Sequence, residues 1–331
     1  MPSERQELHA LIDALRGRRA AVVGDLMLDE YVFGTVSRIS PEAPVPVVDV
    51  DVDQHAYAPG GATNVANNLR ALGVEVALFG VVGDDPQGQI LLGRLRQLGI
   101  DTSGVLVDRD RPTTVKTRII AHSQQVVRVD REVRAPLSSQ SAARLVEAAT
   151  ACVGHGVHAL LISDYDKGVA TAAVVAETVS RCRRAGLLVA ANPKPANLEY
   201  FRGASVVTLN HLEAEAAAGE RLGNEERLRA AGQKLCQHLQ LEALVITRGS
   251  QGMLLVENGG RVTGIPAAPV EVYDVVGAGD TAFSVLALAW AAGAPVPMAA
   301  TLANLAGAAV VRKVGTAVVT PEELHAMVDG V

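Results

Sequence analysis

The chain has 331 residues, of which 49% are hydrophobic and only 3% aromatic, and it carries a formal net charge of -6 at pH 7. Its length and hydrophobic share suffice for the core of one large α/β domain or of two smaller domains. The few aromatic rings and the net negative charge argue against a surface that binds nucleic acid.

Three cysteines, Cys152, Cys182 and Cys236, stand far apart and form no CxxC pair. An odd, scattered set of this kind predicts reduced, buried thiols and a cytoplasmic protein. Residues 1–19 are charged and helical in spacing, without the apolar centre of a secretion signal. The most apolar stretches, near 282–292 and 298–311, are too short to span a bilayer. We therefore expect no contact with a membrane.

Short β-branched runs alternate along the chain with segments rich in Ala, Leu and Arg. The expected strands are 18–24, 74–83, 158–164, 187–192, 204–210 and 242–249, and the expected helices include 63–73, 89–99 and 172–186. This alternation predicts βαβ units and a buried, mainly parallel sheet with helices on both faces, which is a three-layer α/β/α domain.

Two segments, Tyr31–Ala58 and Thr113–Val133, break this rhythm with a period-two alternation. They could form a small antiparallel sheet that projects as a lid, or extra edge strands of the central sheet, and the pattern alone leaves both open. Because no linker, repeat or long charge run divides the chain, we expect residues 1–331 to form one domain with an inserted lid.

The sequence GAGD, Gly277 to Asp280, follows an expected strand end and leads into an apolar helix. Glycines allow a tight turn and the close approach of an anion, and the first N–H groups of a helix have no partner within the helix. Asp280 would lie beside the bound anion, where a carboxylate could accept a proton from an attacking hydroxyl. An ordinary glycine turn with Asp280 as a capping acid would explain the same four residues.

Other nucleotide-binding and hydrolytic motifs are missing from the sequence. No GxxxxGK[ST] occurs, which excludes a P-loop enzyme, and no GxGxxG follows the first strand, which disfavours a dinucleotide fold. HExxH and the GxSxG nucleophile elbow are also absent.

Polar and glycine residues follow each strand at the edge where ligands bind in doubly wound sheets. They are Asp25 and Asp29; Gly60, Gly61, Asn64 and Asn68; Asp164, Asp166 and Lys167; Asn192 and Lys194; Asn210 and Glu213; and Thr247, Gly249 and Gly252. Each of them alone is equally well explained by helix capping or by a solvated loop. Their coincidence with GAGD predicts a binding site along this edge.

At GAGD, NxxE and the early GG, the chain resembles the ribokinase (PfkB) family of carbohydrate kinases over nearly its whole length. The stretches SRISPEAPVPV, PGGATNVANNL, SDYDKG and TRGSQGM resemble a subgroup that phosphorylates a heptose 7-phosphate for the synthesis of ADP-heptose in the lipopolysaccharide core. The resemblance implies a ribokinase-like fold with a β-sheet lid, ATP as co-substrate, Mg²⁺, and a homodimer formed through the lid. Because the sequence ends at Val331, we expect a stand-alone kinase.

The resemblance also implies roles for individual residues. Asp280 corresponds to the catalytic base, and Gly277, Ala278 and Gly279 to the anion hole; Asn210 and Glu213 organise phosphate and water-bound Mg²⁺; Asp29, Gly60, Gly61 and Asn64 bind the sugar; Thr247, Gly249 and Gly252 bind the nucleotide; and Asn304 lies beside the adenine. Asp274 could hold a monovalent cation such as K⁺. The subgroup favours aspartate at position 192 and threonine at position 276, where this chain has Asn192 and Val276.

A phosphorylated sugar needs cations for the phosphate that it already carries. The candidates are Arg38, Lys116, Arg118, Lys167 and Lys194, with Asp164 and Asn192 as polar substrate ligands. Among the cations we favour Lys167, Lys194 and Arg38. Two alternatives stay open: a kinase of the same family for another sugar or sugar phosphate, and a non-catalytic protein that senses a sugar or a nucleotide.

Overall fold

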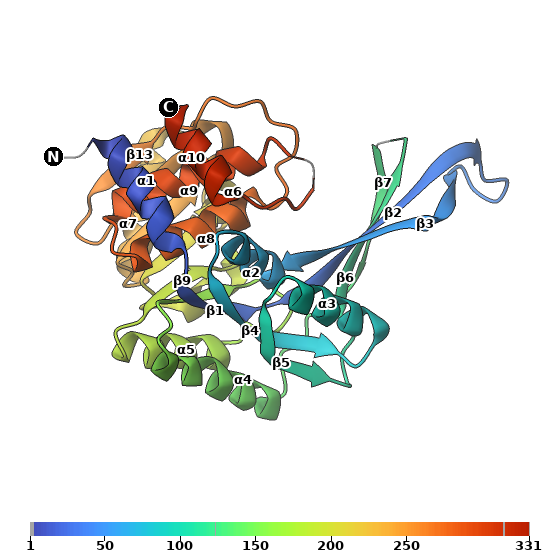
Figure 1. The fold of residues 1–331 in the computed structure, drawn as a ribbon, viewed down its shortest axis with the longest axis horizontal. Coiled ribbons are helices and arrows are strands. Elements are labelled where there is room, and N and C mark those ends of the chain that lie inside the picture. Colours follow the sequence, from blue (N-terminus) through green and yellow to red (C-terminus); the bar gives the residue numbers. More distant parts are fainter. Residues whose placement is uncertain (1–2, 123, 314, 331) are drawn as a thin grey trace.

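A large sheet lies at the centre of the computed structural model, which describes residues 3–122, 124–313 and 315–330 (Figure 1). Within these ranges it has nine strands in the order β13-β12-β11-β10-β9-β8-β1-β4-β5. The strands are β1 Arg19–Gly24, β4 Glu75–Gly83, β5 Asp101–Asp108, β8 Ala159–Ser163, β9 Leu188–Asn192, β10 Val206–Asn210, β11 Ala243–Thr247, β12 Met253–Glu257 and β13 Val262–Ile265. In this order the strands from β5 to β11 pair in parallel, as expected, and the pairs β11–β12 and β12–β13 are antiparallel.

Helices cover both faces of this sheet. One face packs against α1 Glu4–Leu15, α2 Ala62–Ala71, α3 Pro86–Gln97, α8 Ala278–Ala291, α9 Val296–Val310 and α10 Pro321–Asp329. The other packs against α4 Ser139–Ala151, α5 Ala172–Arg184, α6 His211–Ala218 and α7 Glu225–His238. Three short 3₁₀ turns, η1 Cys152–His155, η2 Pro195–Phe201 and η3 Gly249–Gln251, complete these described elements. The three-layer α/β/α prediction is therefore confirmed.

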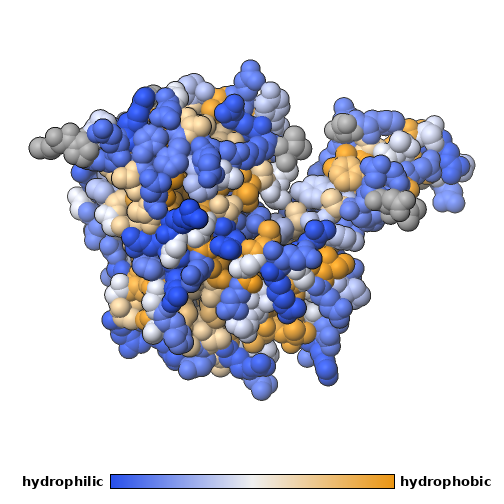
Figure 2. Space-filling view, in the orientation of Figure 1, coloured by the Kyte–Doolittle hydropathy of each residue, from blue (hydrophilic) through white to orange (hydrophobic). Residues whose placement is uncertain are grey.

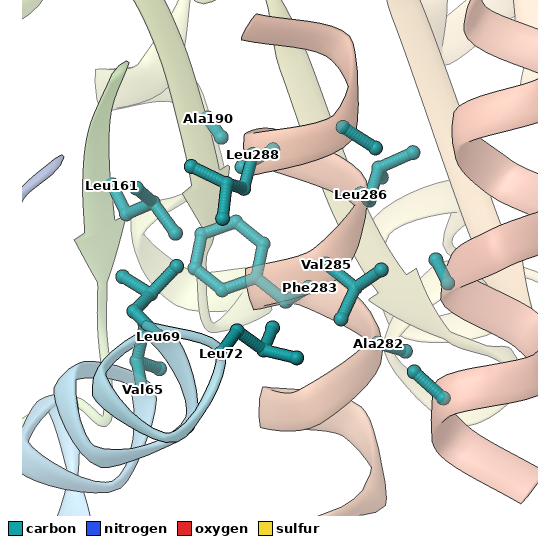
Figure 3. Packing of buried hydrophobic residues seen from close by; sticks show 14 of the residues in the cluster. Val65, Leu69, Leu72, Leu161, Ala190, Ala282, Phe283, Val285, Leu286 and Leu288 are labelled. Atoms are coloured by element: carbon teal, nitrogen blue, oxygen red, sulfur yellow. The ribbon is translucent and has the colours of Figure 1, made fainter. Parts of the chain in front are cut away.

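Helix α8 is apolar nearly all round because neighbours surround it. Phe283 on α8 lies among Leu161 of β8 and Val65 and Leu69 of α2 (Figure 3), and its ring is 1% exposed. Because apolar neighbours enclose this helix on all sides, the burial of its apolar side chains stabilises it along its whole length. This packing fixes the position of the first turn of α8 relative to the sheet.

The two segments that break the α/β rhythm form a separate sheet, which projects from the body of the molecule (Figure 1). Its order is β3-β2-β6-β7, with β2 Leu26–Ile39, β3 Pro46–Gly61, β6 Thr114–Ala121 and β7 Gln124–Arg131. The lid is thus a sheet of its own, and the alternative of edge strands on the central sheet is wrong. The expectation of a wholly antiparallel lid is also wrong, since β2 and β6 pair in parallel.

One residue, Asp25, separates β1 of the central sheet from β2 of the lid. The chain passes so close to β8 at this point that a Cβ on Gly24 would lie 2.0 Å from the carbonyl oxygen of Ser163. Only glycine allows this approach. The lid therefore starts directly at the carboxyl edge of the central sheet, above the loops that follow its strands.

The three cysteines are buried and unpaired, as expected, and burial raises the pKa of the Cys152 thiol to about 12. Over the described residues, no helix has the length and apolar character needed to cross a membrane.

Candidate active site

Asp280 lies in the first turn of α8, directly after the glycine turn that begins the helix. Gly277 is the N-cap residue and has a φ of 80°, a left-handed conformation that glycine adopts readily. The N–H groups of this first turn have no carbonyl partner within the helix, and the positive end of the helix dipole lies here. The turn therefore offers a site for an anion next to a carboxylate.

The Asp280 carboxylate accepts two side-chain hydrogen bonds, each on a different oxygen. Asn64 Nδ2 donates to Oδ2 and the Tyr165 hydroxyl donates to Oδ1, both at 2.8 Å. The interpretation of Asp280 as a simple capping acid is therefore wrong, because its oxygens face the cleft and not the helix amides. Burial raises the pKa of Asp280, while the bonds from Asn64 and Tyr165 and the charge of Lys194 act in the opposite direction.

Helix α2 holds Asn64 in place through a short chain of buried hydrogen bonds. Asn68 Nδ2 donates to the Asn64 carbonyl oxygen at 2.9 Å, and the Thr281 hydroxyl donates to Asn68 Oδ1 at 2.7 Å. Both asparagines are buried, at 1% and 0% exposure, so they are not solvated surface positions. The network ties the start of α2 to the start of α8 and thereby fixes the orientation of Asp280.

Tyr165 belongs to the site, although sequence reasoning did not select it. It stands in the loop after β8, which two buried carboxylates organise. Asp25 accepts the N–H groups of Tyr165, Lys167 and Val169, and burial raises its pKa to about 6. A tyrosine between two aspartates has no distinctive spacing, and only the fold brings its hydroxyl to Asp280.

Asp164, predicted as a substrate ligand, instead orders this loop. Its carboxylate accepts the N–H groups of Asp166 and Lys194 and the side-chain amide of Asn197. It is fully buried, with its oxygens occupied by the protein. Asp164 therefore positions Lys194 and is not available to a substrate.

The predicted sugar-binding residues converge at the base of the lid. Asp29 of β2 is 4% exposed and accepts a hydrogen bond from Arg118 Nη1 of β6 at 2.7 Å. A Cβ on Gly60 would lie 2.8 Å from Asp29 Oδ2, so only glycine fits beside this buried carboxylate. Gly61 caps α2 and leads to Asn64. Asp29 lies close enough to raise the pKa of Asp280 through its charge.

A cleft beside Asp280 contains the predicted NxxE residues. Its lining includes Tyr165, Asn192, Lys194, Asn210, Glu213 and Asp280. Asn210 caps α6 by accepting the Glu213 N–H at 2.9 Å, and Lys194 Nζ lies 2.6 Å from Glu213 Oε1. Asn192 donates to the Thr208 carbonyl and hydroxyl oxygens at 3.0 and 2.9 Å, so its amide is held against β10.

A larger, more apolar cavity of about 590 Å³ adjoins this cleft, and both are lined by Thr247 and Gly279. The predicted nucleotide residues Gly249, Gly252 and Asn304 line it together with apolar residues of 267–275 and of α9. Its volume lies within the range of small-molecule sites. The structure therefore brings Thr247, Gly249, Gly252 and Asn304 around one cavity next to Asp280, while Asn210 lines the adjoining cleft.

Two of the three cations favoured for a distal phosphate lie elsewhere. Arg38 is exposed near the tip of the lid, nine residues beyond Asp29 along β2, or about 30 Å for an extended strand. Lys167 is buried with its Nζ 2.9 Å from Glu132 Oε1. Within its own chain, neither the Arg38 guanidinium group nor the Lys167 ammonium group is free in the cleft. This corrects the prediction that these two residues bind the distal phosphate there.

A metal held by protein ligands alone does not fit this site. Within the described parts of the chain, no group of three or more His, Cys, Asp or Glu side chains could hold a metal ion. Mg²⁺ commonly takes one or two carboxylates together with water and substrate phosphates. The donor set of Glu213 and the neighbouring amide oxygens fits that mode, in which triphosphate and water supply most of the ligands.

Asp274, the candidate for a monovalent cation, joins two loops next to α8. Its carboxylate accepts the N–H of Val276 at 3.0 Å and the N–H of Gly315 at 2.9 Å. Asp274 is close in the chain to the glycine turn that begins α8, as expected, but both of its carboxylate oxygens already have partners in the protein.

Known proteins match this chain over nearly its whole length. The sequence pattern of the pfkB family of carbohydrate kinases matches residues 18–323. The bifunctional protein HldE of Geobacter sulfurreducens is 44% identical over 321 residues, which are 97% of this chain and 65% of that protein. HldE of Pelobacter propionicus is 42% identical with the same coverage. The chain thus spans about 65% of the length of these curated relatives.

Solved structures share the fold at low sequence identity. Phosphofructokinase-2 from Escherichia coli, in complex with potassium, superposes with a TM-score of 0.77 at 17% identity, covering 95% of this chain and 98% of that one. Ribokinase from Arabidopsis thaliana, complexed with ribose and ATP, has a TM-score of 0.73 at 16% identity, covering 95% and 99%. These likenesses establish the ribokinase-like fold.

Proposed function

The chain belongs to the pfkB family of carbohydrate kinases, and on that premise we propose that it phosphorylates the anomeric hydroxyl of D-glycero-β-D-manno-heptose 7-phosphate with ATP. The product would be the 1,7-bisphosphate, a precursor of ADP-heptose for the lipopolysaccharide core. The observation that carries the proposal is the Asp280 carboxylate, held at the mouth of α8 between Asn64 and Tyr165.

The transfer needs an aligned hydroxyl, a base and a site for the negative charge. The sugar binds beneath the lid against Asp29, Gly60 and Asn64, with its anomeric hydroxyl at Asp280. The hydroxyl oxygen forms a bond to the γ-phosphorus as the bond to the β-phosphate oxygen breaks, and its proton passes to Asp280. ADP leaves with the electrons of the broken bond.

The first turn of α8 stabilises the transferred group. Its N–H groups donate to the phosphoryl oxygens in the manner of an oxyanion hole, where one donor contributes about 3 kcal/mol. Lys194, held by Glu213 at 2.6 Å, adds a positive charge on the nucleotide side. The base of ATP occupies the cavity between the Thr247–Gly252 loop and Asn304.

Mg²⁺ would be held by Glu213 through water, and when bound it neutralises phosphate charge. Glu213 is oriented for this by its capping bond with Asn210. The use of K⁺ near Asp274 also stays a prediction, which is tested by the dependence of turnover on KCl at constant ionic strength.

The choice of heptose 7-phosphate as substrate rests on the sequence stretches SRISPEAPVPV and PGGATNVANNL, which lie in the lid and at its base. A coupled kinase assay tests it, with heptose 7-phosphate, fructose 6-phosphate and ribose as substrates and the product identified by phosphorus NMR. We expect the highest kcat/KM with heptose 7-phosphate and a new phosphate at the anomeric carbon. Preference for another sugar would identify a different kinase of the family, and no ATP turnover with any sugar would support the non-catalytic alternative.

The pH dependence of turnover should reflect the buried base. Only the ionised carboxylate accepts a proton, so kcat falls as the pH is lowered through the pKa of Asp280. Burial raises this pKa above its ordinary 3.8, so the acid limb should lie at a higher pH than for an exposed aspartate. A pH profile of kcat measures it. A profile that is flat down to about pH 4 would contradict Asp280 as the base.

The lid offers a surface for a second copy of the chain. Hydrophobic residues are exposed on it among hydrophilic ones (Figure 2), and on β7 Val127 and Val129 are 44% and 53% exposed. Because a sheet with an open apolar face is stabilised when it is covered, we expect a homodimer through the lid. Sedimentation velocity should show a dimer for the wild type and a monomer for Val129→Lys. A wild-type monomer at micromolar concentration would contradict this.

A further inference from the structure

The Tyr165 hydroxyl touches the proposed base directly, although the phosphoryl transfer itself gives it no part. It lies 2.8 Å from Asp280 Oδ1, while Asn64 Nδ2 lies at the same distance from the other carboxylate oxygen. An ionised carboxylate only accepts hydrogen bonds, and its two oxygens together have about four lone-pair sites. The phenol proton of Tyr165 therefore points to Asp280, and lone pairs remain on the carboxylate for a sugar hydroxyl.

Buried carboxylates fix the loop that carries Tyr165 on both sides of this residue. Asp25 accepts the N–H of Tyr165 at 2.7 Å, and Asp164 accepts the N–H of Asp166 at 2.8 Å. Asp25 and Asp164 are 1% and 0% exposed. Because these bonds order the backbone before any substrate binds, the hydroxyl reaches Asp280 with little further loss of conformational freedom.

Tyr165 is a donor in this contact and not a second base. Burial raises its pKa well above the ordinary value, and Asp280 raises the pKa further through its charge and its hydrogen bond. The charges of Asp29 and Glu213 also raise the pKa of Tyr165. The phenol therefore stays protonated at every pH at which an aspartate changes its charge.

Two ammonium groups lie over the Tyr165 ring. Lys194 Nζ is 5.1 Å and Lys116 Nζ is 5.8 Å from the ring centre, which is within the range of a cation–π contact. A cation in this position attracts the π electrons of the ring, so the phenol oxygen holds its proton less tightly and becomes a stronger hydrogen-bond donor. Tyr165→Phe would keep the ring between its neighbours and remove the hydroxyl alone.

Asp280 depends on such donors because its surroundings otherwise favour the neutral acid. Burial raises the pKa of Asp280, and the charge of Asp29 raises it as well. Three groups lower this pKa and so favour the ionised form, namely Asn64, Tyr165 and Lys194. A neutral Asp280 takes no proton from a hydroxyl. The donors therefore decide how far the pH can fall before turnover stops.

We propose that Tyr165 is a positioning residue that acts through Asp280, keeps this carboxylate ionised and thereby sets the lower pH limit of turnover. The inference rests on the proposed function, because it concerns the base of the same site. A hydrogen bond to a charged group is about twice as strong as one between neutral groups. Tyr165 therefore binds the carboxylate more strongly than the neutral acid, and its bond weakens when Asp280 takes the proton.

The test compares the pH profile of kcat for Tyr165→Phe with that of the wild type. Removal of a donor favours the neutral acid, so the acid limb should move to higher pH, by about one to two units for a hydrogen bond to a charged group. Above the limb, kcat should stay within about threefold and the KM for the sugar within about twofold. Tyr200→Phe, on η2 at the other face of the sheet, is the matched control and should keep the wild-type profile.

Titration of Asp280 without substrate separates this inference from the kinase assignment. Carbon NMR of isotope-labelled aspartate follows the carboxylate directly, and the Asp280 signal is identified by its loss in Asp280→Asn. We expect Asp280 to titrate at higher pH in Tyr165→Phe than in the wild type, even if no sugar is phosphorylated. Fluorotyrosine at position 165, whose more acidic hydroxyl is a stronger donor, should move the titration to lower pH.

Two results would overturn the role of Tyr165: an unchanged titration of Asp280 in both variants of position 165, or a kcat that falls equally at every pH in Tyr165→Phe. The second result would mean that the hydroxyl only supports the local structure. Failure of the wild type to phosphorylate any sugar would overturn the proposed function alone.

Discussion

Replacing Asp280 by asparagine is expected to lower kcat by about 10³-fold while the KM for the sugar stays within a few-fold of the wild type. General-base catalysis contributes about 10²- to 10⁴-fold in enzymes, and an amide cannot take the proton. The effect is increased here because both Asn64 and Tyr165 donate to this position. An amide accepts only on its oxygen, so its nitrogen would face one of these donors. Steady-state kinetics with saturating ATP measures the change.

Asp166→Asn is the matched control for Asp280→Asn. Asp166 lies in the Tyr165 loop with a φ of 58°, a conformation that asparagine tolerates, and its side chain is 43% exposed. We expect its kcat to stay within about twofold of the wild type, since it carries no proton in the reaction. A kcat for Asp280→Asn near that of the control would remove Asp280 from the role of base.

Arg118→Met should destabilise the fold by about 3 kcal/mol or more, because it removes the partner of a buried carboxylate. Arg118 and Asp29 are only 12% and 5% exposed and lie 2.7 Å apart. Urea unfolding measures the loss. Adding Asp29→Asn to Arg118→Met should recover part of it, since the second change removes the uncompensated charge.

An exposed pair provides the comparison for Arg118. Arg109 and Asp84 lie 3.2 Å apart with side chains 86% and 49% exposed. Arg109→Met should change the free energy of unfolding by less than about 0.5 kcal/mol, as is typical of solvated pairs. If Arg118→Met unfolded at the same urea concentration as Arg109→Met, the Asp29–Arg118 pair would not stabilise the base of the lid.

The alternation of strands and helices could be predicted from the sequence because β-branched runs and amphipathic segments are local signals. The GAGD turn was also recognisable, since its glycines and Asp280 are neighbours in the chain. The strand pairing of the lid could not be predicted, because the parallel contact of β2 with β6 joins segments about 90 residues apart. The antiparallel β12–β13 edge is a hairpin of chain neighbours, in which Met253 pairs with Ile265, and it was not predicted.

Individual site residues were predictable where their role depends on chain neighbours, and not where it depends on tertiary partners. Asn64 and Glu213 could be selected from the sequence, because glycines and an NxxE spacing identify them. In the structure Asn64 donates to Asp280 and Glu213 lines the cleft. Asp164 and Lys167 are as polar in sequence as true ligands, yet backbone amides and Glu132 occupy their charged groups. Tyr165 lacks any sequence signal, because its contact with Asp280 spans 115 positions.

The most direct test of the account is a crystal structure with heptose 7-phosphate and a non-hydrolysable ATP analogue. We predict that the anomeric oxygen lies within hydrogen-bonding distance of Asp280 and that the γ-phosphate lies at the first turn of α8. A sugar or triphosphate bound away from Asp280 and the first turn of α8 would contradict the central claim.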